Sequence, residues 1–327
     1  MGYCKKWNPP TAPSRDNLAA WKMLFSDLHE NLLLGGWVQT DTPDQLVIDD
    51  VEELPADNAY AGFIEYALDD GLQAAAPVIM SLEFGCGQER ADSNTSASNG
   101  ANRLPRIRAS VSFKGVSSQS FGCPQGYSPT LGASTNTNTL HGASYLCSSP
   151  GRGFFGIVYG AGTRRATHGY IGSTFSLFVQ RTTDGNGNPT SDGLALYYNG
   201  LSSQSGTAIS GGIWANANLL AAFSEFLPSH GNSRSRAYAT RIPAAAEVKS
   251  ANGELLLEPI YYSAPALKQF PYLFSYNYAA LAEGSEIALE IGPGQALNFI
   301  ALGRETSMSI DTYDAQRAGL VMLFDEG

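Results

Sequence analysis

The residues best spaced to hold a metal ion are Asp184, Asn186 and Asn188, which have the spacing that opens an EF-hand calcium loop. The rest of the loop departs from that pattern. Its sixth position is Pro189, where a glycine is needed for the sharp turn, and its twelfth is Ala195, where a bidentate glutamate belongs. The sequence therefore predicts a hairpin tip that holds no metal.

A second candidate is the glycine-rich stretch GRGFFG at residues 151–156, which matches the G-x-G-x-x-G pattern of dinucleotide-binding loops. In those loops the motif follows a strand and opens a helix, whose N-terminus binds the phosphates. Here it follows Ser149 and Pro150 and leads into the strand-like segment 154–159. We therefore expect a glycine-rich turn and no nucleotide cofactor.

The sequence contains no clear set of residues for acid–base or nucleophilic catalysis. Three carboxylate pairs could in principle serve glycoside hydrolysis, but loop acids of this kind are usually solvated: Asp49-Asp50, Glu52-Glu53 and Asp69-Asp70. The histidines are far apart and none has a partner at metal-ligand spacing: His29, His141, His168 and His230. No G-x-S-x-G, H-E-x-x-H or phosphate-loop motif occurs. The sequence thus assigns no catalytic, cofactor-binding or metal residue, and predicts that the chain is not an enzyme.

The chain has four cysteines, Cys4, Cys86, Cys123 and Cys147, and no C-x-x-C pair. This spacing excludes zinc ribbons and thioredoxin-like redox sites. Cys123 and Cys147 bracket one loop and could pair, whereas a chain that folds in a reducing cytosol usually keeps its thiols reduced. The sequence does not decide whether Cys123 and Cys147 form a disulfide.

Composition limits the partners. Charged residues make up 15% of the 327 residues, where about 25% is usual, and the net charge is -10. Such a negative field repels phosphate backbones, so we expect no nucleic-acid partner. Short basic clusters are interpreted as edge-strand or interface charge: Arg103, Arg106 and Arg108; Arg164 and Arg165; Arg234, Arg236 and Arg241. No run of 18 apolar residues and no signal peptide is found, so no membrane span is expected.

The elements that would position these residues begin with an extended arm at residues 1–13. A helix is predicted over 16–34, with an apolar stripe at spacings of three and four: Leu18, Trp21, Phe25, Leu28 and Leu32. Ser14 or Asp16 is the expected N-cap. Gly35 and Gly36 are expected to end the helix in a left-handed conformation.

After the helix the period changes to two, as in Ile107, Ala109, Val111 and Phe113, which alternate with polar residues. Strands are predicted at 37–40, 45–51, 61–66, 77–84, 107–113, 154–159, 170–180, 194–198, 207–214, 254–262, 272–278, 286–291, 296–301 and 319–324. A turn at 182–192, with Gly185 and Gly187 at positive φ, joins two of them. A polar loop is predicted at 115–150 and a short helix at 216–226.

This pattern predicts a mainly β fold, in which the N-terminal helix is followed by two β-sandwich or partly closed barrel-like domains with long loops. The predicted divisions are 1–36 for the arm and helix, 37–200 for the first β domain, and 201–327 for the second β-rich domain.

Three stretches occur together in a familiar order: GWVQT at 36–40, DDGLQAAAPVIMSLEFG at 69–85, and SLFVQRTTDGNGNPTSDG at 176–193. Over residues 14–200 this combination resembles structural proteins of tailed-bacteriophage virions, found in tail, baseplate or fibre-attachment positions. The resemblance implies a virion subunit, assembled in the host cytoplasm, whose partners are copies of itself and other virion proteins. It brings no catalytic residues with it.

Two other functions stay open. Aromatic residues make up 11% of the chain, and together with the 115–150 loop they suit a module that binds a host-surface saccharide. A polysaccharide or cell-wall hydrolase is the third hypothesis, and it requires a cleft that holds a carboxyl group of raised pKa.

Overall fold

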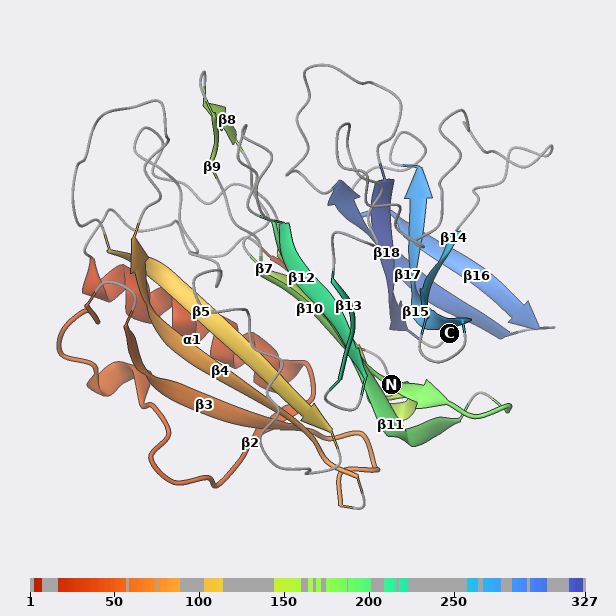
Figure 1. The fold of residues 1–327 in the computed structure, drawn as a ribbon, viewed down its shortest axis with the longest axis horizontal. Helices are drawn as coiled ribbons and strands as arrows, with labels where there is room; N and C mark the ends of the chain where they lie inside the picture. The colour runs from red at the N-terminus through yellow and green to blue at the C-terminus, as the bar shows by residue number, and fades with distance from the viewer. Residues whose placement is uncertain are drawn as a thin grey trace.

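The structure is a computed structural model of the chain, and it describes residues 3–7, 17–56, 59–74, 76–88, 103–113, 144–159, 164–166, 169–171, 175–186, 188–200, 209–215, 218–222, 258–263, 267–277, 284–292, 295–304 and 318–325. The described part consists of antiparallel sheets and one long N-terminal helix (Figure 1). The prediction of a mainly β fold with an N-terminal helix is confirmed.

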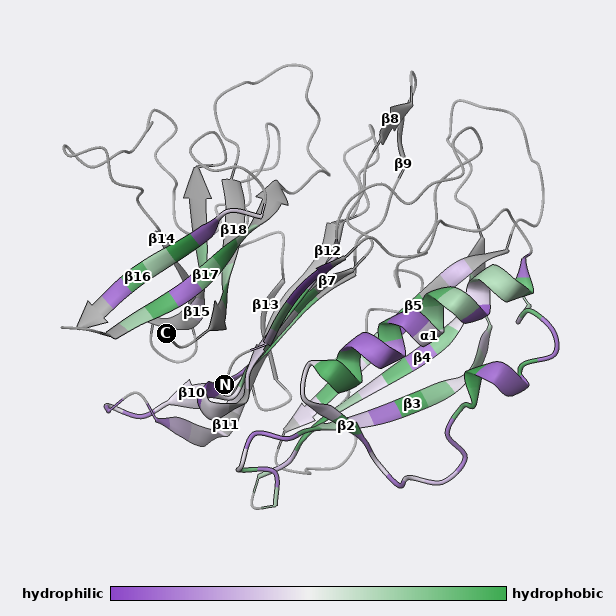
Figure 2. Ribbon diagram, turned by 180° about the vertical axis from the view of Figure 1, so that it is seen from behind, coloured by the Kyte–Doolittle hydropathy of each residue, from purple (hydrophilic) through white to green (hydrophobic). Residues whose placement is uncertain are grey.

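The first layer is a four-stranded sheet with one face covered by a helix. Its antiparallel order is β2 (Trp37–Gln39), β3 (Tyr60–Leu68), β4 (Val78–Gln88) and β5 (Arg103–Phe113). Helix α1 (Leu18–Leu34) lies along one face of this sheet (Figure 2). Side chains alternate as predicted in β5, where Ile107, Ala109 and Val111 are buried and Ser110 is partly exposed.

Helix α1 forms as predicted, except at its ends. Asn17 is the N-cap, and its side-chain oxygen accepts a hydrogen bond from the Ala20 N–H at 3.1 Å. The expectation of Ser14 or Asp16 as the cap is therefore wrong; an asparagine one residue closer to the apolar stripe reaches the first turn. The left-handed residue at the other end is Gly36, with φ 88°, while Gly35 has φ −79°.

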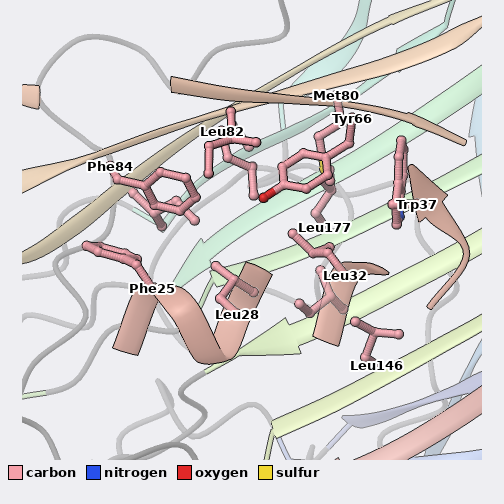
Figure 3. Close-up of a cluster of buried hydrophobic side chains, with 14 of the residues drawn as sticks. Phe25, Leu28, Leu32, Trp37, Tyr66, Met80, Leu82, Phe84, Leu146 and Leu177 are labelled. Atoms are coloured by element: carbon pink, nitrogen blue, oxygen red, sulfur yellow. The ribbon is translucent and has the colours of Figure 1, made fainter. Parts of the chain in front are cut away.

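The apolar stripe of α1 faces the core, as predicted. Trp21, Phe25, Leu28 and Leu32 are at most 1% exposed, and Leu18 packs against the same cluster at its rim. Figure 3 shows Phe25, Leu28 and Leu32 beside Tyr66, Met80, Leu82 and Phe84 of the four-stranded sheet. The four fully buried stripe side chains each contribute on the order of 1.5–3 kcal/mol before entropy is subtracted.

The second layer is a seven-stranded antiparallel sheet that supplies the rest of this core. Its order is β1 (Tyr3–Trp7), β6 (Ser144–Ser149), β7 (Phe154–Tyr159), β10 (Phe175–Thr183), β11 (Pro189–Gly200), β12 (Ile209–Ala215) and β13 (Asn218–Ala222). Leu146, Phe155, Ile157, Leu177 and Val179 project from one face into the cluster with α1. Phe155 meets Trp37 edge-on, with ring centroids 5.1 Å apart.

The third layer is a five-stranded sheet on the other face of the seven-stranded sheet. Its order is β14 (Glu258–Ser263), β15 (Leu267–Asn277), β18 (Ala318–Asp325), β17 (Gln295–Arg304) and β16 (Glu286–Gly292). The two sheets approach closely at Gly156, where an added Cβ would lie 2.7 Å from Met322 Sδ. Phe154 and Tyr272 also meet, with ring centroids 5.8 Å apart. The seven-stranded sheet therefore separates two cores (Figure 1).

Two predicted elements are wrong. Segment 45–51 is not a strand: Leu46 makes one backbone bond to Phe63, and residues Ile48–Asp50 form a short 3-10 helix, η1. The predicted helix at 216–226 is wrong where the structure describes it, because residues Asn218–Ala222 form β13. A short apolar run suits either structure by periodicity alone, and the antiparallel pairing of β13 with β12 favours the strand.

Other segments differ in extent from their predictions. Residues 3–7 of the arm form β1, and residues 144–149 of the predicted polar loop form β6; residues 114–143 lie outside the described residues. The described residues of the predicted strand at 170–180 belong to β9 (Gly169–Ile171), which pairs with β8 (Arg164–Ala166), and to β10. The domain boundary at residue 200 stays a prediction. Within the described residues, no helix has the length and hydrophobicity needed to cross a membrane.

Candidate functional site

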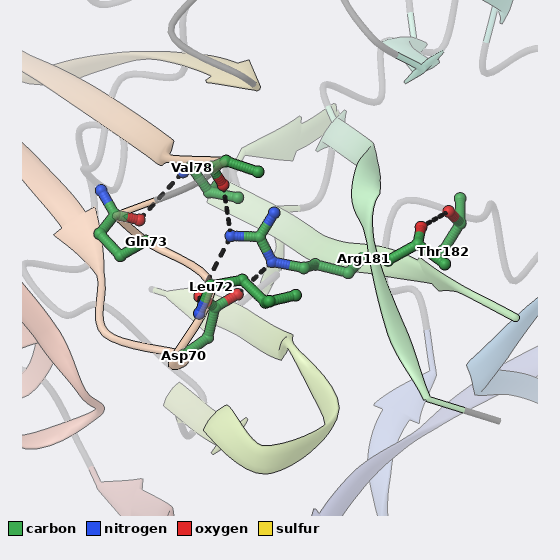
Figure 4. Close-up of polar contacts among 8 residues, drawn as sticks. Asp70, Leu72, Gln73, Val78, Arg181 and Thr182 are labelled. Atoms are coloured by element: carbon green, nitrogen blue, oxygen red, sulfur yellow. Dashed lines mark hydrogen bonds and ion pairs between the residues drawn. The ribbon is translucent and has the colours of Figure 1, made fainter.

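The two sheets of the first core are joined by a buried ion pair, which we call the Arg181 junction. Arg181 comes from β10, and Asp70 from the turn between β3 and β4 (Figure 4). The Arg181 Nε–H donates to Asp70 Oδ2, and Nη2 donates to Asp70 Oδ1 at 3.1 Å and to the Ala76 carbonyl at 2.7 Å. Both side chains are 0% exposed. Such a bidentate pair is among the stronger polar contacts in proteins.

Local turns position both Asp70 and Arg181. The turn after β3 contains Gly71 at φ 76°, and Asp70 Oδ1 also accepts the Leu72 N–H at 3.1 Å, so the carboxylate helps to form the turn that holds it. On the other side, Gly153 of the GRGFFG stretch has φ 60°. An added Cβ there would lie 2.8 Å from Arg181 Cγ, and the Gly153 carbonyl accepts the Arg181 N–H at 2.8 Å. The glycine-rich turn thus packs against an arginine.

The burial of the junction limits its chemistry. Neither side chain reaches solvent, so neither can exchange a proton with a dissolved substrate. A buried pair of charges is costly to break, because the remaining charge is left without compensation. The Arg181 junction is therefore a structural connection between sheets and not an acid–base site.

The carboxylate pairs separate into two kinds. Asp49, Asp50, Glu52 and Glu53 are exposed, as expected for solvated loop acids, and so is Asp69. The exception is Asp70, for which the sequence predicts a solvated loop position. The missed signal is Arg181 itself, a charged residue two positions after the apolar run Leu177–Phe178–Val179, next to the end of the predicted strand.

His29 lies on α1 at the border of the apolar stripe, and its Nδ1 is 2.8 Å from the Tyr66 hydroxyl. Burial raises the pKa of Tyr66 well above its usual range, so the hydroxyl stays protonated, and the tautomer of the imidazole decides which of the two groups donates. Burial also lowers the pKa of His29, against a smaller opposing effect of Glu30. His141, His168 and His230 lie outside the described residues.

We expect the burial of His29 to make stability depend on pH. The folded-state pKa of His29 lies below its ordinary value of 6.5. The stability that the folded chain gains by keeping this imidazole neutral is therefore fully present above about pH 6.5. As the pH falls below that value, the unfolded chain binds the proton first and the folded state loses stability. Denaturant unfolding at about pH 7.5 and about pH 5.5 should therefore show a smaller pH-dependent loss in His29→Gln than in the wild-type chain. Equal losses in both chains would contradict this role.

In the hairpin between β10 and β11, the acidic residue Asp184 accepts hydrogen bonds from the loop itself. Asp184 Oδ1 accepts the N–H groups of Asn186 and Asn188 at 2.8 and 2.9 Å, and Oδ2 accepts the Asn188 side-chain amide at 3.3 Å. The expected positive φ at Gly185 is wrong, since this side-chain-capped turn does not need it. Gly187 lies outside the described residues.

We expect calorimetric titration with calcium to give no binding heat, because the Asp184 carboxylate already accepts the loop's own N–H donors. Asp184→Ala should lower the free energy of unfolding by about 1 kcal/mol through loss of those bonds. Asn186→Ala, which keeps the backbone donor, is the matched control. Tight calcium binding by the wild-type chain would overturn the assignment.

The cysteines are arranged differently from the sequence hypothesis. Cys4 of β1 lies directly opposite Cys147 of β6, and their Sγ atoms are 2.7 Å apart. Cys147 therefore has a partner 143 residues away in the chain, while Cys123 lies outside the described residues. Local spacing along the chain gave no signal for this pairing.

The surface of the first layer carries apolar side chains. The large hydrophobic residues that are exposed, among those whose side chains the structure describes, are Met23 (52%), Leu33 (42%), Leu34 (58%), Val38 (52%) and Val47 (57%). They belong to α1, β2 and the segment after β2, and none is aromatic. An aromatic platform for stacking a sugar is therefore not found among these described side chains.

The arginine clusters lie on short or terminal strands where the structure describes them. Arg103, Arg106 and Arg108 belong to β5, the last strand of the four-stranded sheet, as expected for edge-strand charge. Arg108 pairs with Glu83 and lies over the Tyr60 ring, 4.6 Å from its centroid. Arg164 and Arg165 belong to β8, and the cluster Arg234, Arg236 and Arg241 lies outside the described residues.

Comparison with known proteins gives no relative from which a role could be carried over. No family model matches the chain, and no match was found among curated proteins or solved structures.

Proposed function

We propose that the chain is a structural subunit of a tailed-bacteriophage virion, of the tail or baseplate type, which acts by assembling with copies of itself and other virion proteins. The observation that carries the proposal is the position of β1. A segment at the chain's start completes the edge of a sheet beside β6, more than 130 residues away in the sequence. Addition of a strand to a sheet edge is a recurrent mode of protein–protein docking.

The exposed apolar side chains of α1 and β2 support the same proposal. A subunit with only 15% charged residues has much neutral surface, and proteins that act alone generally keep their exposed apolar patches small. Contact with neighbouring subunits would cover Leu33, Leu34 and Val38. Obligate interfaces are more apolar than ordinary protein surface.

The proposal includes no catalytic activity. The buried acid Asp70 is neutralised by Arg181, and the other acids of the three predicted pairs are exposed. A glycoside hydrolase needs two carboxyl groups facing one cleft, one of them with a raised pKa. None of the described acids of these pairs has that environment.

A quantitative mass-spectrometric inventory of purified particles of the phage that encodes the chain tests the proposal. We expect the chain in fixed stoichiometry with the tail or baseplate proteins. Light scattering of the isolated chain should show association that increases with concentration. Absence from the particle, together with a protease-resistant monomer in solution, would overturn the proposal.

Surface variants make this test specific. The double substitution of Leu33→Ser and Leu34→Ser should reduce association with little change in unfolding free energy, because both side chains are already exposed. Glu30→Gln, an exposed position on the same helix, is the matched control. Binding of the isolated chain to a glycan array, with no place in the particle's structural core, would favour the saccharide-binding hypothesis instead.

A further inference from the structure

We propose that Cys4 and Cys147 are a disulfide-forming pair that fastens the N-terminal strand β1 to the seven-stranded sheet. This inference goes beyond the proposed virion role and does not depend on it. Its basis is the alignment of two thiols on neighbouring strands, held there by backbone pairing on both sides.

The strand register supplies the geometry. Cys4 and Cys147 are directly opposite partners, flanked by the pairs Tyr3↔Ser148 and Lys5↔Leu146. Opposite residues in an antiparallel pair have Cα atoms roughly 4.5–5.5 Å apart, within the roughly 4.4–6.8 Å that a disulfide spans. Both thiols are free in the structure, and their Sγ atoms lie 2.7 Å apart. Bond formation therefore needs little backbone movement.

The surroundings determine the order of the chemical steps. Cys147 is buried at 0% exposure, whereas Cys4 is partly exposed on the edge strand. A small disulfide oxidant in solution therefore reaches Cys4 first. Burial and the neighbouring Cys4 raise the pKa of the Cys147 thiol well above its usual value. The second step, in which Cys147 must lose its proton, should accordingly become faster as the pH rises.

With oxidised glutathione as the oxidant, the reaction balances as two exchanges. The Cys4 thiolate attacks one glutathione sulfur, forming a mixed disulfide and releasing one glutathione. The Cys147 thiolate then attacks Cys4 Sγ, which forms the Cys4–Cys147 bond and releases the second glutathione. Two protein thiols are oxidised, the S–S bond of the oxidant is reduced, and the two thiol protons end on the two glutathione molecules.

The bond would add a covalent link to a strand that is otherwise held by backbone pairing and side-chain contacts, among them the packing of Tyr3 against the core. Lys6 lies over the Tyr145 ring, with Nζ 5.4 Å from the centroid, and an added Cβ at Gly284 would come within 2.9 Å of the same Nζ. The backbone ladder with β6 pairs all five residues of β1. The cross-link would keep β1 paired even when that ladder opens.

The primary test is peptide mapping of the full chain after incubation with oxidised glutathione, without reduction. Trypsin alone leaves Cys123 and Cys147 on one peptide, because no lysine or arginine lies between Lys114 and Arg152. Adding chymotrypsin, which cuts after tyrosine, separates them. We expect a Cys4–Cys147 linked peptide from monomeric protein. Alkylation of both thiols after oxidation, or cross-links only between separate chains, would overturn the proposal.

The second measurement is thermal melting of the oxidised and reduced chains. Closing so long a loop should raise the melting temperature by roughly 5–15 °C, and reduction should abolish the increase. Cys4→Ser and Cys147→Ser should lack the difference, whereas Cys123→Ser should retain it. A shift that persists in Cys4→Ser but disappears in Cys123→Ser would assign the bond to Cys123 and overturn the proposal. The peptide map of the wild-type chain stands even if a variant fails to fold.

Discussion

We expect Asp70→Asn to lower the free energy of unfolding by about 3–5 kcal/mol, because it leaves the Arg181 guanidinium buried without a compensating charge. Arg181 is 0% exposed, and its Nη1 already has no hydrogen-bond partner within the described residues. The asparagine keeps the size of the side chain, so the loss reports charge and not packing. Denaturant unfolding followed by far-UV circular dichroism measures it.

The matched control for this prediction is Glu83→Gln, which removes the charge of a carboxylate paired with Arg108. Both side chains of that pair are 30% exposed, so we expect a loss of about 0–1 kcal/mol. A double variant, Asp70→Leu with Arg181→Met, should recover most of the lost stability, because an apolar pair of similar volume removes both buried charges. A loss below about 1 kcal/mol in Asp70→Asn would mean that water reaches the junction.

The second large effect is expected at Trp21, where alanine should cost about 3–5 kcal/mol. The Trp21 ring is 0% exposed and meets Phe25 edge-on, with centroids 4.7 Å apart. Its Nε1–H donates to the Gly85 carbonyl of β4 at 2.8 Å, so the side chain also ties α1 to the sheet. Loss of the ring leaves both a cavity and an unsatisfied carbonyl.

Two further variants separate these contributions, again by denaturant unfolding. Trp21→Phe keeps most of the apolar volume and removes the N–H donor, and should lose about 1–3 kcal/mol. Met23→Ala, on the exposed side of the same helix at 52% exposure, should change stability by less than about 0.5 kcal/mol. If Trp21→Ala cost less than about 1 kcal/mol, the stripe would instead face a partner subunit or solvent.

Local patterns determined much of the fold. The three- and four-residue spacing of the α1 stripe placed Trp21, Phe25, Leu28 and Leu32 on the buried face, and alternation along β5 placed Ile107 and its alternate neighbours in the same core. Both signals lie within one element, where the repeat of the helix or strand fixes which side chains share a face. The same local reasoning correctly predicted the strand that begins at Phe154, within the GRGFFG stretch.

The tertiary structure decided what joins these elements. In the sequence, nothing distinguishes Asp70 from other loop acids, and only the fold places it beside Arg181. Cys147 lies opposite Cys4 only because β1 pairs with β6 at the edge of the seven-stranded sheet. Likewise β13 is a strand because β12 offers a partner, although its apolar run suits a helix equally well. Each of these outcomes depends on contacts with another element, and the repeat within one element carries no information about which partner it will meet.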